Sequence, residues 1–222
     1  GDRLGTVLVV TLLPVPLVSL LYDVHNTITA TPTAAYPLAT GYLLYGFVNL
    51  LVVGLLYALL APDMRSTVFA FEWPSLAEVT VAVAAFVAGL GVYQMTARLS
   101  ASLGYHLRGL DYSLNDPTTV LVIVAGAVVL APVTEEILYR GLVLGALASR
   151  GFGAVSATVV MTALFALIHL PNFGVAGTLF ISVWGLLPAA LRLRYGNLTG
   201  AVTMHVLNNL FAYVVVVAAG WT

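Results

Sequence analysis

The chain has 222 residues, of which 61% are hydrophobic and 8% charged, and its mean hydropathy is +1.04. Soluble domains carry about 25% charged residues, so a soluble fold of this composition would expose large apolar patches. The formal net charge of −1 excludes the basic surface of a nucleic-acid-binding protein. The absence of cysteine excludes disulfides and thiolate metal sites. The composition predicts an all-α, polytopic integral membrane protein.

Seven apolar runs approach the roughly 20 residues that a helix needs to cross a bilayer core. They are continuous rather than alternating, which favours helices over strands. Residues 25–37, rich in Thr, Pro and Ala, predict a loop after the first run. Pro132 predicts a kink in the fourth run, which counts as one bent helix or two, so the chain has seven to eight spans. The runs are residues 4–21, 41–61, 76–98, 118–148, 154–170, 175–193 and 199–219.

Residues 1–222 are predicted to form a single transmembrane domain, although the first run also resembles a signal sequence. Helix starts are indicated at Ser75, after Trp-Pro, and at Asp116, which precedes a proline. Seven helices would divide the arginines unequally between the two sides of the membrane. The positive-inside rule then places the N-terminus in the cytoplasm. The protein is expected in the cell membrane. One side holds Arg3, Arg65, Arg150, Arg192 and Arg194, and the other holds Arg98 and Arg108.

A few polar side chains fall inside the apolar runs, where ionisable groups are costly and indicate function. At 1.5 Å per residue, Glu135, His169 and His205 lie about 22, 28 and 16 Å from the arginines at one membrane edge. These depths allow the three side chains to meet in the inner part of the bilayer. The complete set is Glu135, Glu136, Arg140, His169 and His205, accompanied by Asn208 and Asn209.

The two neighbouring glutamates are predicted to differ in their partners. Glu136 and Arg140 are four residues apart and share a helix face, whereas Glu135 lies about 140° from Arg140 around the helix. This geometry pairs Arg140 with Glu136 and favours Glu135 as a general base. The alternative is a buried structural ion-pair cluster of all three residues, but a single arginine cannot fully neutralise two carboxylates.

Two histidines complete the candidate site. Phe165 stands four residues before His169, so its ring can pack beside the imidazole, and either Asn208 or Asn209 can share a face with His205. Alone, His169 fits an interfacial histidine, and His205 with an asparagine fits interhelical hydrogen bonding. Together, a carboxylate, two imidazoles and an amide suffice for acyl-transfer hydrolysis.

Three motifs in this order resemble those of a known family: Glu-Glu-x-x-x-Arg at 135–140, Phe-x-x-x-His at 165–169 and His-x-x-x-Asn at 205–209. They resemble the CPBP (CAAX protease and bacteriocin-processing, Abi) intramembrane proteases, and among them the type II CAAX prenyl endopeptidases. The resemblance covers a catalytic core at about residues 117–212. The first three helices carry no motif of this kind.

The resemblance implies an endopeptidase that acts near the C-terminus of membrane-associated substrates, including prenylated CAAX-type proteins. It implies that Glu135 activates the attacking water with help from His169. His205 and Asn209 would stabilise the oxyanion, while the supporting residues would be Glu136, Arg140, Phe165 and Asn208. Which of the two amides faces the site stays open. The expected partners are membrane lipids and a peptide or lipidated protein, with no nucleic acid, and the oligomeric state is not indicated.

Catalysis without a metal is favoured, because the His-Glu-x-x-His zinc signature is absent and asparagine is a poor zinc ligand. In the zinc alternative, a metalloprotease, the ligands would be Glu135, His169 and His205. Two other functions stay open. One is a catalytically silent membrane scaffold or regulator of the same fold, and the other is a proton-coupled transporter, for which the chain lacks an internal repeat. Gly141 and Gly145 permit close helix packing or would line a lateral opening.

Overall fold

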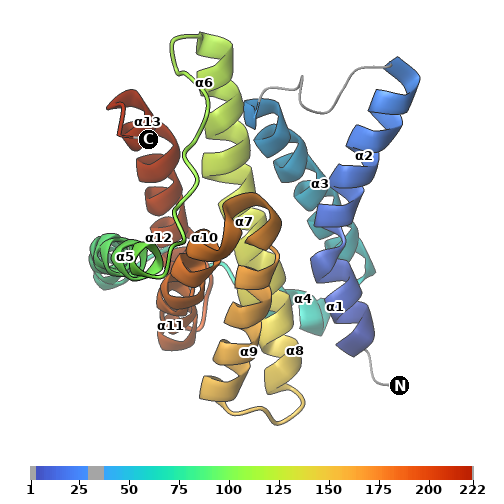
Figure 1. Cartoon of the computed structure of the whole chain (residues 1–222). Coiled ribbons are helices and arrows are strands. Elements are labelled where there is room, and N and C mark those ends of the chain that lie inside the picture. The colour runs from blue at the N-terminus through green and yellow to red at the C-terminus, as the bar shows by residue number, and fades with distance from the viewer. Residues whose placement is uncertain (1–3, 30–37, 222) are drawn as a thin grey trace. The chain divides into compact units, whose positions relative to one another are not determined.

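The computed structural model describes residues 4–29 and 38–221, and every element within these ranges is a helix (Figure 1). The predicted all-α class is therefore confirmed for the described part of the chain. The helices group into two compact units. Among the described residues, one unit comprises residues 4–29, 38–60, 110–135 and 209–221, and the other comprises residues 61–109 and 136–208.

Five helical runs in the described residues are long and apolar enough to cross a membrane, and a bent pair at the N-terminus would make a sixth. Together with their composition, these runs support an integral membrane protein, but the predicted seven to eight spans are not confirmed. The five are Leu38–Leu59, Leu76–Ser102, Pro117–Ala148, Leu170–Tyr195 and Thr199–Ala218.

The bent pair explains one departure from the predicted spans. Helices α1 (Leu4–Leu12) and α2 (Pro14–Thr29) meet at an angle of 43°, because Pro14 has no N–H to continue the hydrogen-bond ladder. Since α2 continues to Thr29, the predicted loop over residues 25–37 is wrong for residues 25–29, and residues 30–37 lie outside the described ranges.

The fifth predicted span is shorter than expected. Helix α9 (Ala154–Leu167) has 14 residues, or about 21 Å of helix at 1.5 Å per residue. That length is less than the roughly 30 Å hydrocarbon core. The apolar run at 154–170 therefore overstates the helix, which ends before His169.

The fourth predicted run is one continuous span. It begins at α6 (Pro117–Ile123), where the Asp116 carboxylate accepts the Thr119 N–H at 2.8 Å and Pro117 occupies the first turn, so the predicted start is confirmed. That N–H bond holds the pKa of Asp116 below its usual value. Two π-helical segments flank the short α7, and Pro132 lies in the first turn of α7. The successive elements are η2 (Val124–Leu130), α7 (Ala131–Glu136), η3 (Ile137–Val143) and α8 (Leu144–Ala148).

In the first unit, α3 (Leu38–Leu59) packs against α2, α6 and η2. A Cβ atom on Gly126 would lie 2.7 Å from the backbone of Leu43, so only glycine permits this approach of η2 to α3. Tyr42 and Tyr213 meet edge to face with ring centroids 4.9 Å apart. Tyr213 belongs to η4 (Phe211–Val215), which continues into α13 (Val216–Ala218).

In the second unit, α10 packs against α5 and α9, and α9 also contacts α8 and η3. Figure 1 shows α8 and α9 side by side, joined by a loop at the bottom of the view. Ser75 caps α5 by accepting the Glu78 N–H at 3.1 Å, which confirms the predicted helix start. The remaining elements are α4 (Pro62–Val68), α5 (Leu76–Ser102), α10 (Leu170–Trp184), α11 (Leu186–Tyr195) and α12 (Thr199–Leu210).

Candidate active site

Glu135 and Glu136 are consecutive residues of α7, between the π-helical segments η2 and η3. π-Helical turns are rare and are found frequently at functional sites. Both glutamates are buried, with 3% and 0% of their surface exposed. Buried carboxylates need hydrogen-bonding or charged partners, and the two residues have different ones.

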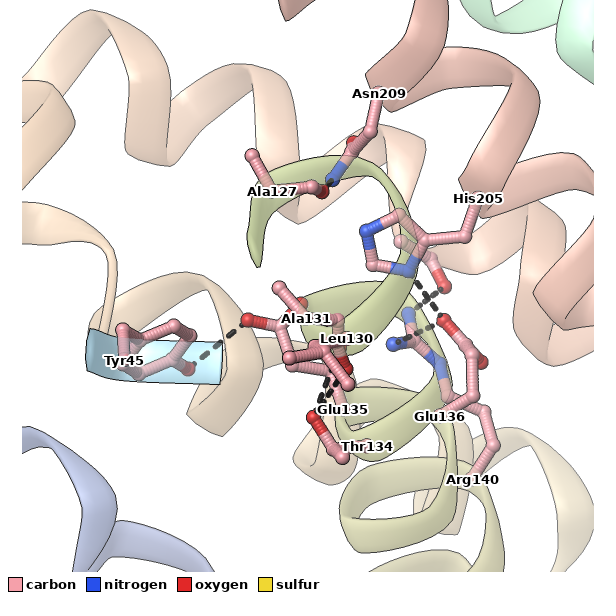
Figure 2. A network of polar contacts seen from close by, with 11 residues as sticks. Tyr45, Ala127, Leu130, Ala131, Thr134, Glu135, Glu136, Arg140, His205 and Asn209 are labelled. Atoms are coloured by element: carbon pink, nitrogen blue, oxygen red, sulfur yellow. Dashed lines mark hydrogen bonds and ion pairs between the residues drawn. The ribbon is translucent and has the colours of Figure 1, made fainter. Parts of the chain in front are cut away.

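Glu135 belongs to the first unit, where its Oε1 accepts the Tyr45 hydroxyl at 2.9 Å (Figure 2). Tyr45 lies on α3, in the part of the chain where the sequence showed no usable motif. A signal for this partner is present, however, because Tyr42, Tyr45 and Asn49 follow one face of an otherwise apolar helix. Sequence reasoning missed Tyr45 as a candidate site residue.

Asn209 also belongs to the first unit, and its Nδ2 donates to the Ala127 carbonyl of η2 at 2.8 Å (Figure 2). On α7, the Thr134 hydroxyl donates to the Leu130 carbonyl at 2.7 Å. Asn209 is buried, whereas Asn208 belongs to the second unit and is half-buried. The two amides therefore occupy different surroundings, with Asn209 held on η2.

In the second unit, Arg140 pairs with Glu136, as their spacing predicts. The Arg140 Nη1 lies 3.2 Å from the Glu136 Oε1, and both side chains have no exposed surface (Figure 2). Arg140 also donates from Nη2 to the Gly185 carbonyl at 2.9 Å, and its guanidinium carbon lies 4.4 Å from the Phe165 ring centroid. The buried cation is thus held by a carboxylate, a carbonyl and an aromatic face.

His205 joins the same ion pair through Glu136. Its Nδ1 lies 2.8 Å from the Glu136 Oε1, a contact between residues 69 positions apart (Figure 2). The ring meets Trp184 at 4.9 Å and Phe165 at 6.2 Å between centroids, both near edge-to-face. The sequence predicted an intramembrane His205 but not Glu136 as its partner.

His169 follows the end of α9 and is half-buried. Its Nδ1 lies 2.7 Å from the Phe165 carbonyl, and because a carbonyl can only accept, Nδ1 carries the proton. The predicted packing of Phe165 beside His169 is confirmed, with centroids 4.7 Å apart. The turn after His169 is braced by Arg108, which donates to the Pro171 and Asn172 carbonyls at 2.9 and 3.1 Å.

The second unit thus brings together five of the predicted residues, Glu136, Arg140, Phe165, His169 and His205. Phe165 contacts both imidazoles and the Arg140 guanidinium, and Glu136 bridges Arg140 and His205. Glu135 and Asn209 are placed in the first unit, where Tyr45 and Ala127 hold them. Chemically, the gathered groups can accept and donate protons and can stabilise a negative charge.

The zinc alternative finds no support in the described residues. Among residues 4–29 and 38–221, no group of three or more His, Cys, Asp or Glu side chains is arranged to hold a metal ion. Glu135, His169 and His205 were the three ligands that this alternative required. The term metalloprotease is therefore not supported.

Comparison with known proteins gives one match. Residues 117–211 match the family model described as type II CAAX prenyl endopeptidase Rce1-like. No curated protein and no solved structure matches the chain. The match includes all three motifs that suggested the resemblance, and it confirms that resemblance. Residues 117–211 of the chain are therefore similar to the Rce1-like type II CAAX prenyl endopeptidases, a family of proteases.

Proposed function

We propose that the protein is an intramembrane endopeptidase that hydrolyses a peptide bond near the C-terminus of membrane-associated proteins, including prenylated CAAX-type substrates. The observation that carries this proposal is the family match over residues 117–211. That segment contains Glu135, His169, His205 and Asn209, the four residues to which the resemblance gives catalytic roles. The long apolar helices of the described residues suit a substrate that is itself anchored in the membrane.

In the proposed mechanism, Glu135 takes a proton from water with help from His169, and the water oxygen attacks the scissile carbonyl. His205 and Asn209 donate hydrogen bonds to the developing oxyanion, and each such donor is worth about 2.7–4 kcal/mol in known enzymes. Glu135 then returns the proton to the leaving amine as the C–N bond breaks. The proton removed from water thus leaves with the amine product.

The local contacts support these roles. Because Nδ1 of His169 donates to the Phe165 carbonyl, the neutral ring has its proton-accepting lone pair on Nε2. Asn209 is anchored to Ala127 through one of the two N–H donors of its amide. The Tyr45 hydroxyl donates to Glu135 and so orients its carboxylate.

The test is cleavage of a prenylated C-terminal peptide by the purified full chain in liposomes. Glu135→Gln should lower kcat by about 100-fold to 10,000-fold, the usual contribution of a general base. Glu72→Gln is the matched control, because Glu72 is exposed and lies outside the matched segment. An unprenylated peptide of the same sequence measures how much the lipid contributes. Wild-type cleavage by Glu135→Gln would rule out the proposed mechanism.

A further inference from the structure

Two donors converge on a single oxygen of Glu136. Arg140 approaches Oε1 at 3.2 Å and His205 approaches the same oxygen at 2.8 Å. The side chains of Glu136 and Arg140 have no exposed surface, and that of His205 has 5%. In so dry a setting the hydrogen-bond roles of the three groups are set by their chemistry rather than by exchange with water.

These contacts determine which nitrogen of His205 carries a proton. Arginine remains charged in proteins, so its pairing favours the ionised form of Glu136, and an ionised carboxylate can only accept hydrogen bonds. Nδ1 of His205 must then donate. We propose that Glu136 is a positioning residue that fixes the tautomer of His205, so that Nε2 is the nitrogen through which His205 acts on the substrate. This inference rests on the proposed function of the site.

The packing around the ring supports the same assignment. A ring flip would exchange the two edges of the imidazole. The rings of Trp184 and Phe165 oppose such a flip, because they pack against His205 with centroids 4.9 and 6.2 Å away. Phe165 is itself held under the Arg140 guanidinium at 4.4 Å. Arg140 therefore acts twice on His205, through the carboxylate of Glu136 and through the aromatic wall.

The tautomer has a consequence for the chemistry of His205. With its Nδ1 proton donated to Glu136, Nε2 can donate to an oxyanion only when it too is protonated, as in the imidazolium. The charges of Glu136 and Arg140 cancel, so the positive charge of the imidazolium balances the developing oxyanion, and no bond is broken in this step. His169 differs, because its Nδ1 partner is the neutral Phe165 carbonyl. The two histidines thus share a protonated Nδ1 and differ in the charge of the group that accepts its hydrogen bond.

The direct test is nitrogen NMR of the full chain, in detergent, with ¹⁵N-labelled histidine. The protein has four histidines, and a His205→Asn variant identifies the signals of His205. In the wild-type protein we expect a proton on Nδ1 of His205. A neutral ring protonated on Nε2 alone would overturn the proposal. This test uses the wild-type protein, with no substitution at Glu136.

Two variants separate positioning from simple structural support. Glu136→Gln keeps an acceptor oxygen at nearly the same place, and should preserve the Nδ1 proton. Glu136→Ala removes the acceptor, and should give a mixture of tautomers and a drop in kcat of about 100-fold or more with little change in KM. A tautomer unchanged in Glu136→Ala would contradict the proposal. If that variant does not fold, the spectra of the wild type and Glu136→Gln still decide.

The outcome is independent of the test of the proposed function. If Glu135→Gln cleaves as well as the wild type, the proposed mechanism fails, yet the spectrum of His205 still shows whether Glu136 fixes its tautomer. If Glu135→Gln is inactive but His205 carries its proton on Nε2, the protease proposal survives and the role of Glu136 fails. The two measurements thus address different residues and different observables.

Discussion

Gly141 directly follows Arg140, and its lack of a side chain allows α4 to approach η3. A Cβ atom there would lie 2.2 Å from the Val68 carbonyl oxygen, which belongs to the α4 backbone and cannot rotate away. At Gly145, one turn later, the nearest atom would be a Thr67 methyl group at 3.8 Å, an ordinary contact. Of the two interpretations open from the sequence, close packing holds for Gly141.

Gly141→Ala should therefore destabilise the protein by about 1–3 kcal/mol, the usual cost of overpacking. Gly145→Ala is the matched control, and should be neutral or stabilising by up to about 1 kcal/mol, because alanine has the higher helix propensity. Thermal unfolding of the two variants in the same detergent measures the difference. Equal melting temperatures would show that α4 does not constrain residue 141.

The residues of the site show which contacts a sequence can predict. The pairing of Glu136 with Arg140 was predicted because both residues lie on one helix, four positions apart. The contact of Glu136 with His205 joins residues 69 positions apart, and that of Tyr45 with Glu135 joins residues 90 apart. Such contacts depend on how distant helices pack, which local periodicity does not specify.

Among the elements, α12 depends on a segment outside the family match. Residues 70–78, the connection from α4 to α5 together with the first turn of α5, hold the first residues of the helix that carries His205. The Ala70 carbonyl accepts the Leu198 N–H at 2.7 Å, and the backbone of Glu72 exchanges hydrogen bonds with the Thr199 hydroxyl. The Glu78 carboxylate, 3% exposed, accepts the Gly200 N–H at 2.8 Å. An acidic group is favourable there, at the positive end of the helix dipole.

Glu78→Ala should destabilise the protein by about 1–3 kcal/mol, because the buried Gly200 N–H would lose its acceptor. Glu78→Gln retains an acceptor oxygen and should cost less. Glu72→Ala is the control, since Glu72 uses only backbone groups in this contact. Hydrogen exchange at the first amides of α12 reports the effect locally. Unchanged exchange in Glu78→Ala would show that the carboxylate does not hold this helix end.

The starts of helices could be predicted from the sequence, whereas irregularities within the helices could not. Ser75 and Asp116 cap as predicted, because a capping side chain acts on its own first turn. The π-helical segments η2 and η3 lie within one long apolar run, and their composition does not distinguish them from an α-helix. The length of α9 was overestimated for a similar reason, because hydrophobicity continues beyond the residue at which the helix ends.

Contacts around Thr67 in the second unit predict how residues 145–195 would cross a membrane. Gly145 of α8 approaches the Thr67 side chain, and Arg192 of α11 donates to the Thr67 carbonyl at 3.2 Å. The start of the α8–α9 loop and the end of α11 therefore lie near the same end of α4. The chain must then run away from this end of α4 along α9 and return to it along α10 and α11. With the start of α9 at a membrane edge, about 21 Å of helix would put the turn at His169 within the roughly 30 Å hydrocarbon core.

Single-cysteine labelling tests this out-and-back course, because the chain has no cysteine of its own. Ser149→Cys and Arg194→Cys, both at exposed positions, should react with a membrane-impermeant thiol reagent from the same side of the membrane. Tyr105→Cys, beyond the far end of the α5 span, should react only from the other side. If α9 did not pair with α10 and α11, the single crossing by residues 170–195 would put Ser149 and Arg194 on opposite sides. Labelling of those two positions from opposite faces would therefore refute this course and the depth it gives to His169.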